Sequence, residues 1–204
     1  MLALLASAAC GSSAKKAARD TEPTPSDYPL AAYASRRIAV VPVQGMTDEK
    51  GALGDLSRRV ALRSLDSAIS RALDDRALHP RWVVAEEVAK SSARNSTYTA
   101  DPYAYSVAVL DRLPLGERMG EPLSSQLRTM VALQSDVRFV LVPHALLLER
   151  QKDGSTRATL RLALVDARAT DLLWRGEVQA ETPSAPGPAL WRMLGTKLAA
   201  LAAP

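Results

Sequence analysis

Two short segments of this chain are apolar at consecutive positions, and they constrain the fold more than any other feature. Residues 38–43 read Ile-Ala-Val-Val-Pro-Val, and residues 139–143 read Phe-Val-Leu-Val-Pro. Successive side chains of a β-strand point to opposite faces of its sheet, so a strand of this kind must be covered on both faces. The two segments therefore predict an α/β fold, in which helices pack against a central sheet.

Helical periodicity separates these two predicted strands. Residues 55–78 carry apolar side chains along one helix face, with Asp55 as the expected N-cap. Residues 81–84 follow as a short strand, which we expect to run parallel to the first strand. Further helices are predicted over residues 86–93 and 123–134, from their amphipathic spacing.

The period of the pattern changes to two in the last part of the chain. Residues 157–164 and 172–179 alternate apolar and polar side chains, which is typical of strands with one solvated face. Asp153-Gly154 predicts a hairpin turn before the first of them, and residues 168–171 predict a turn between them. The side chains of the last strand that we expect on the core face are Leu172, Trp174, Gly176 and Val178. A closing helix is predicted from its apolar face, formed by Leu190, Trp191, Leu194, Leu198 and Leu201.

Taken in chain order, the predicted elements are β-α-β-(α)-α-β-β-β-α. The fold class is therefore expected to be α/β with a mixed sheet, a C-terminal antiparallel meander, and helices packed on the sheet. Residues 36–204 are expected to form this single domain, because their length suits one domain of ordinary size.

The only cysteine of the chain, Cys10, follows the short apolar run of residues 4–9. An apolar run that ends in small residues is typical of a signal peptide, and a cysteine at the first mature position resembles a lipobox. In a lipobox the thiol is diacylglycerated and the new amino terminus is acylated, for example with palmitate. We therefore expect residues 1–9 to be a lipoprotein signal peptide, shortened because no Lys or Arg precedes Cys10, and residues 10–35 to be a lipidated, flexible tether. The alternative is an incidental or buried cysteine in a disordered N-terminus.

The charge balance narrows the range of partners. The 26 Lys and Arg residues against 22 Asp and Glu give a formal net charge of +4. Because these charges are scattered, without a basic stripe among aromatic residues, we do not expect binding to nucleic acid. No run approaches the roughly 18 apolar residues of a membrane-spanning helix, so contact with the membrane is expected through the N-terminal lipid.

No pattern in the sequence predicts a catalytic residue, a metal site or a cofactor. The two histidines, His79 and His144, are expected to be structural, and no group of Cys and His has the spacing of zinc ligands. Residues 51–54 are glycine-rich but lack the ending of a phosphate-binding loop. The adjacent carboxylates Asp74-Asp75 and Glu86-Glu87 point about 100° apart on a helix, so we expect them to be solvated.

Residues 98–105 hold three of the five tyrosines, at Tyr98, Tyr103 and Tyr105. Tyrosines on a loop suit contacts with another protein or a glycan, because each has an apolar ring and a polar hydroxyl. The other interpretation is that they hold this long connection against the sheet. Both interpretations stay open on the sequence alone.

The strand at residues 38–43, the long helix after it and the late hairpin at residues 164–174 resemble a group of bacterial envelope proteins. The group includes the N-terminal domain of TolB, the curli-secretion lipoprotein, and the lipoproteins that activate penicillin-binding proteins. Asp171 occupies a position where the group often has glycine. This difference is compatible with a turn, because Asp also occurs in turns.

This resemblance implies a non-enzymatic protein-binding, assembly or regulatory module, anchored by lipid on the periplasm-facing side of the outer membrane, with an envelope protein as its partner. One alternative is an oligomeric secretion pore, which would need longer alternating strands than residues 103–110 offer. The other is an envelope hydrolase. The oligomeric state is left open.

Overall fold

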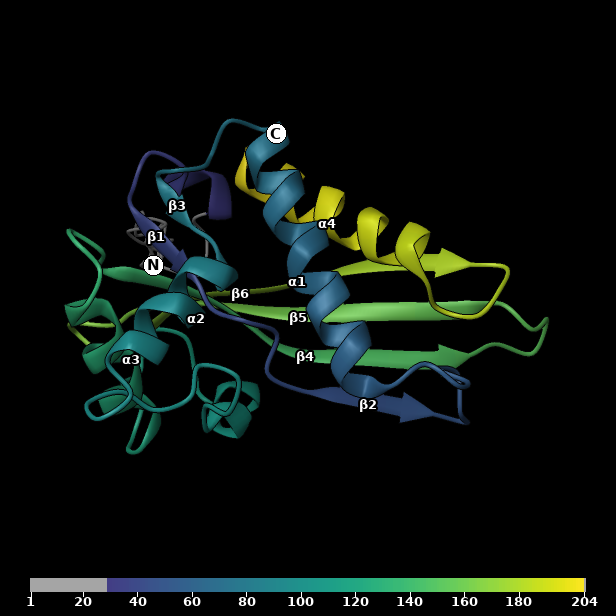
Figure 1. Cartoon of the computed structure of the whole chain (residues 1–204), viewed down its shortest axis with the longest axis horizontal. Helices are drawn as coiled ribbons and strands as arrows, with labels where there is room; N and C mark the ends of the chain where they lie inside the picture. Colours follow the sequence, from purple (N-terminus) through teal and green to yellow (C-terminus); the bar gives the residue numbers. More distant parts are fainter. Residues whose placement is uncertain (1–28, 204) are drawn as a thin grey trace, which may run out of the picture.

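The computed structural model of the chain describes residues 29–203 and contains one six-stranded sheet (Figure 1). The path β3-β1-β4-β5-β6 runs across the sheet, and β2 also pairs with β4. Strands β1, β2 and β3 join the sheet in parallel, whereas β4, β5 and β6 form an antiparallel meander. The predicted mixed α/β class is therefore confirmed. The strands are β1 (Ile38–Val40), β2 (Met46–Glu49), β3 (Trp82–Val83), β4 (Phe139–Arg150), β5 (Thr156–Asp166) and β6 (Asp171–Thr182).

The helices agree with the predicted periodicity within a few residues. They are α1 (Arg58–Asp75), α2 (Ala85–Arg94), α3 (Leu123–Ala132) and α4 (Pro188–Ala202), with the 3-10 helices η2 (Leu30–Tyr33) and η3 (Val107–Asp111). The N-cap of α1 is Ser57, whose side chain accepts a hydrogen bond from the backbone N–H of Val60. The predicted cap at Asp55 is wrong, because the chain enters the helical conformation only after Ser57.

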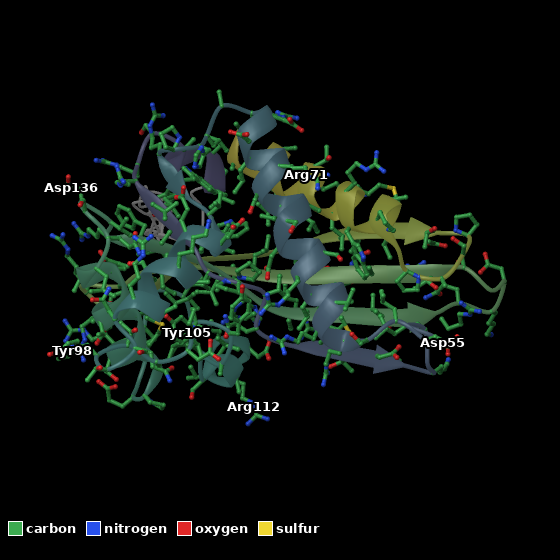
Figure 2. The ribbon with its side chains drawn as sticks, viewed as in Figure 1. Asp55, Arg71, Tyr98, Tyr105, Arg112 and Asp136 are labelled. Atoms are coloured by element: carbon green, nitrogen blue, oxygen red, sulfur yellow. The ribbon has the colours of Figure 1, made fainter. Side chains whose placement is uncertain are left out.

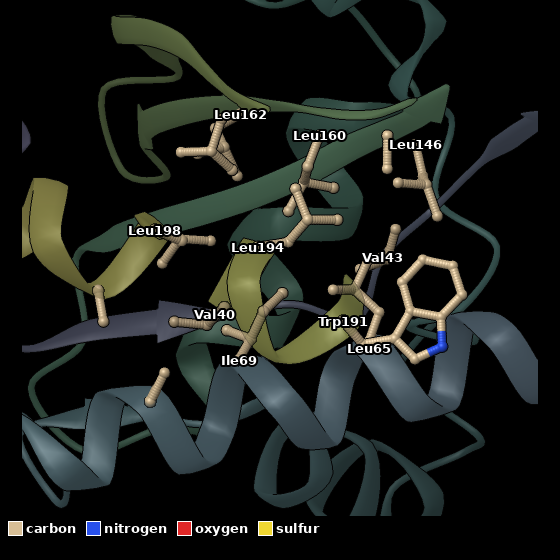
Figure 3. Packing of buried hydrophobic residues seen from close by; sticks show 14 of the residues in the cluster. Val40, Val43, Leu65, Ile69, Leu146, Leu160, Leu162, Trp191, Leu194 and Leu198 are labelled. Atoms are coloured by element: carbon tan, nitrogen blue, oxygen red, sulfur yellow. The ribbon is translucent and has the colours of Figure 1, made fainter. Parts of the chain in front are cut away.

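Two separate apolar cores cover the two faces of the sheet, as the double-sided strands required. On one face, α1 and α4 pack against side chains of β1, β4, β5 and β6 (Figure 3). On the other face, α2, η3 and α3 pack against alternate residues of the same strands. In β1, for example, Ile38 and Val40 belong to the first core and Ala39 belongs to the second.

The first strand is interrupted where the sequence predicted a continuous run. Pro42 has no backbone N–H, and β1 ends at Val40. The chain stays beside β4, because Gln44 N–H donates to the carbonyl of Pro143 at 3.0 Å. It then resumes as β2, a strand that the apolar pattern did not predict, since three of its four residues are exposed.

The helices α1 and α4 pack closely at Gly195. A Cβ at this position would lie 2.7 Å from the carbonyl oxygen of Ala68, so only glycine fits without a shift of one helix. Most of the predicted core face of α4 is buried, including Trp191, at 1% exposure. The exception is Leu201, which is 37% exposed and does not belong to the core.

A bulge in β6 changes which of its side chains face the core. The pairing with β5 shifts between Leu164, which lies opposite Trp174, and Val165, which lies opposite Leu172. Leu172 therefore joins the core beneath α2 and α3, while Val178 joins the core beneath α1 and α4. The predicted common face of Leu172, Trp174, Gly176 and Val178 is wrong for this reason. The Trp174 ring is only half-buried and covers Gly176, where a Cβ would lie 2.4 Å from it.

The domain begins before the predicted boundary at residue 36. Leu30 is 1% exposed within the core, and the ring of Tyr33 meets that of Phe139 edge to face at 5.5 Å. The last residues of the expected tether thus pack against the domain. The expected signal peptide at residues 1–9, the lipidation site Cys10 and residues 11–28 lie outside the described residues. Among residues 29–203, no helix combines the length and apolar character needed to cross a membrane.

Candidate functional site

The strand order reverses about β1, which places a crevice at its carboxyl end. The chain passes from β1 through β2 and α1 to β3 on one side of β1, and then through α2 and α3 to β4 on the other side. In open α/β sheets, ligands bind at such a point, outside the carboxyl ends of the strands.

Three adjoining hollows of about 630, 510 and 480 Å³ lie at this point, and all of them are lined by Arg63 of α1 and Tyr103 of the connection after α2. We call their union the α1–α2 groove. The charged residues on its walls are Arg58, Arg59, Arg63, Asp66, Arg71, Glu86, Lys90 and Asp101.

Arg63 and Tyr103 form the centre of the groove. The guanidinium carbon of Arg63 lies 5.2 Å from the centre of the Tyr103 ring, which is a cation–π distance. Asp101 positions this tyrosine, because its Oδ1 accepts the backbone N–H of Tyr103 at 3.0 Å. Burial, with a contribution from the nearby Asp66, raises the pKa of the Tyr103 hydroxyl, so the ring stays neutral beside the arginine.

Asp66 lies beneath this pair as a buried carboxyl group. Its Oδ1 accepts the backbone N–H of Val43 at 2.8 Å, which joins α1 to the segment that follows β1. Its Oδ2 is also buried and has no hydrogen-bond partner among the described residues. Burial raises the pKa of Asp66 from 3.8 to about 7, although the Val43 bond and Arg63 act in the opposite direction.

The structure separates the three predicted tyrosines into different environments. Tyr98 is 78% exposed at the edge of the molecule (Figure 2). Tyr103 is half-buried in the groove. Tyr105 is 6% exposed, and burial raises its pKa to about 12. Its backbone N–H donates to Oε1 of Gln44, whose Nε2 donates to the carbonyl of Pro102. Tyr105 therefore holds the connection against the domain, whereas Tyr98 is exposed and Tyr103 lines the groove.

The arginines of α1 were not singled out by the sequence analysis. Arg58, Arg59 and Arg63 are exposed, and none of them pairs with a carboxylate of residues 29–203. The signal that could have found them is the first turn of α1, which contains two arginines and no acidic residue. Negative charge is favoured at that end of a helix, so a pair of arginines there is unusual.

The two histidines occupy the structural places expected for them. His144 lies within β4, is 3% exposed, and has a pKa lowered by burial. His79 lies 3.2 Å from Glu87 across the end of α1. Glu86, the neighbour of Glu87, instead pairs with Lys90 at 2.9 Å, so these adjacent carboxylates do diverge. Within residues 29–203, no three His, Cys, Asp or Glu side chains are grouped to hold a metal ion.

Comparison with known proteins gives similarity of structure alone. No family model and no curated protein sequence matches the chain. Similar solved structures include the PelC dodecamer from Paraburkholderia phytofirmans, at 15% identity and TM-score 0.42 over 86% of this chain and 94% of that one. They also include lipoprotein GNA1162 from Neisseria meningitidis, at 14% identity and TM-score 0.44 over 80% of this chain and 94% of that one. The LpoB C-terminal domain from Salmonella enterica is similar at 10% identity and TM-score 0.38, over 76% of this chain and 96% of that one. The solved structures similar to this chain thus include a lipoprotein.

Proposed function

We propose that this chain is a lipid-anchored protein of the cell envelope that binds a protein partner through the α1–α2 groove and catalyses no reaction. The observation that carries the proposal is the composition of the groove, where unpaired arginines of α1 lie beside Tyr103. Arginine and tyrosine are among the residue types enriched at the positions that contribute most to binding energy at protein interfaces. The groove is open enough to receive side chains of a second protein, with hollows of 480–630 Å³.

The anchor places this groove near a membrane. Lipid chains on Cys10, each contributing about 0.8 kcal/mol per buried methylene, would hold the domain on the periplasm-facing side of the outer membrane. The segment that would have to build a secretion pore does not support that alternative, because residues 103–110 form a loop and η3 rather than a strand.

A crosslinking experiment tests the binding role. A photoreactive amino acid replaces Ala100, which lines the largest hollow, in cells that express the full chain. The matched control replaces Arg81, an exposed residue at the amino end of β3 and hence at the opposite end of the parallel strands. We expect a protein crosslink from position 100, identified by mass spectrometry, and none from position 81. Equal crosslinking from both positions, or none from position 100, contradicts the proposal.

The anchor is tested by Cys10→Ala. We expect the full chain to move from the detergent phase to the aqueous phase in a phase-partitioning assay, because the variant has no thiol to acylate. Replacing an exposed serine of α1, Ser67→Ala, serves as the control and should leave partitioning unchanged. If Cys10→Ala still partitions with detergent, the lipoprotein interpretation is wrong.

A further inference from the structure

We infer that the α1–α2 groove binds an acidic peptide segment, whose carboxylates pair with Arg58, Arg59 and Arg63. This inference rests on the proposed function and adds the chemistry of the partner. A carboxylate is the complementary group for a guanidinium, because two parallel N–H donors match its two oxygens.

The end of the groove beside the first turns of α1 has an excess of positive charge. The ion pairs of other arginines show the contrast, since Arg128 pairs with Glu121 and Arg138 pairs with Asp166. No carboxylate of the described residues lies within ion-pair distance of Arg58, Arg59 or Arg63.

Each carboxylate that lines the groove bonds to a group other than these three arginines. Glu86 pairs with Lys90 at 2.9 Å, and Asp101 accepts the backbone N–H of Tyr103. Asp66 is 8% exposed and bonded to the backbone of Val43. The hollow next to the first turns of α1 therefore carries three arginines against one exposed carboxylate, Asp101.

Local structure prepares these arginines for an anionic ligand. The ring of Tyr103 holds the Arg63 guanidinium at 5.2 Å, which reduces the conformational entropy lost when a carboxylate binds. Arg58 and Arg59 stand in the first turn of an 18-residue helix, whose free backbone N–H groups also favour negative charge.

The shape of the site favours a peptide over a lipid surface. The arginines line a hollow of about 480 Å³, and its other lining residues are Val43, Leu62, Asp101 and Tyr103. A recess with apolar walls and charged edges suits a chain that carries both acidic and apolar side chains. Basic segments that bind anionic membranes instead cluster about 4–8 Lys or Arg, and three arginines line this hollow.

The test is a fluorescence-anisotropy titration of the full chain with a labelled peptide in which Glu and Ala alternate. The control peptide has Gln in place of each Glu. We expect the acidic peptide to bind in the micromolar range and the Gln peptide to bind at least about tenfold more weakly. Binding should weaken with added salt, because exposed ion pairs are screened.

Variants connect the binding to the groove. Arg63→Gln is expected to weaken the binding of the acidic peptide about tenfold, because the variant loses a charge-assisted bidentate contact. Arg81→Gln, the matched control at the opposite end of the parallel strands, should leave binding unchanged. Circular dichroism of Arg63→Gln should match that of the unaltered chain, since Arg63 is exposed on its helix.

Each remaining outcome overturns the inference in a distinct way. Equal binding of the Gln peptide, or equal loss from Arg63→Gln and Arg81→Gln, excludes recognition of carboxylates by this groove. Binding to vesicles with anionic phospholipid, without binding to the peptide, assigns the arginines to a membrane instead. If position 100 crosslinks a protein but no acidic peptide binds, the proposed function stands and the acidic partner is wrong.

Discussion

Trp191→Ala is expected to lower the free energy of unfolding by about 3–5 kcal/mol, the range for truncating a fully buried aromatic side chain. Trp191 is 1% exposed and lies on α4 in the core between that helix, α1 and the sheet (Figure 3). Its neighbours cannot collapse into the vacated space, because α1 and α4 already touch at Gly195. The cavity would therefore remain, and the full cost of the lost contacts would appear.

Urea denaturation followed by tryptophan fluorescence or circular dichroism measures this change. The matched control is Met193→Ala on the same helix, where the side chain is 37% exposed. We expect the control to cost less than about 1 kcal/mol, as substitutions near the surface do. A similar small cost for Trp191→Ala would mean that α4 does not pack on the sheet through this face.

Asp66→Asn is expected to stabilise the protein at pH 8 by an amount on the order of 4 kcal/mol, relative to its effect at pH 4. Burial raises the pKa of Asp66 from 3.8 to about 7. Between these two pH values, the Asp66 carboxyl is therefore protonated in the folded state and ionised in the unfolded state. The contribution of the Asp66 carboxyl to the stability of the unaltered chain is therefore fully present below about pH 4, and it is lost as pH rises through about 7. Asparagine keeps an acceptor for the N–H of Val43 and carries no charge at any pH.

The measurement is the difference in unfolding free energy between Asp66→Asn and the unaltered chain across this pH range, because contributions of other groups cancel in that difference. Asp75→Asn, an exposed carboxyl on the same helix, is the control and should change stability by less than about 0.5 kcal/mol. A difference for Asp66→Asn that does not vary with pH would show that the Asp66 carboxyl is solvated in the folded protein.

The fold could be predicted from the sequence wherever local periodicity matches burial. The apolar pattern at residues 38–40 required two covered faces, and the structure supplies α1 and α4 on one side and α2 and α3 on the other. The Asp153-Gly154 turn and the alternation before Leu164 likewise predicted the hairpin of β4 and β5. These features depend on side chains close together in the chain, which is why the sequence is sufficient for them.

The sequence alone determined the mixed α/β class, the order of the main helices and strands, and the structural places of His79 and His144. The tertiary structure decided the bulge at Leu173, which places Leu172 in one core and Trp174 against the other. It also decided the groove, since Arg63 of α1 and Tyr103 of the connection after α2 meet only when these two parts of the chain pack beside each other. The physical reason is the same in both cases. Register between strands and contact between distant side chains depend on how whole elements pack, and no pattern within one segment records that packing.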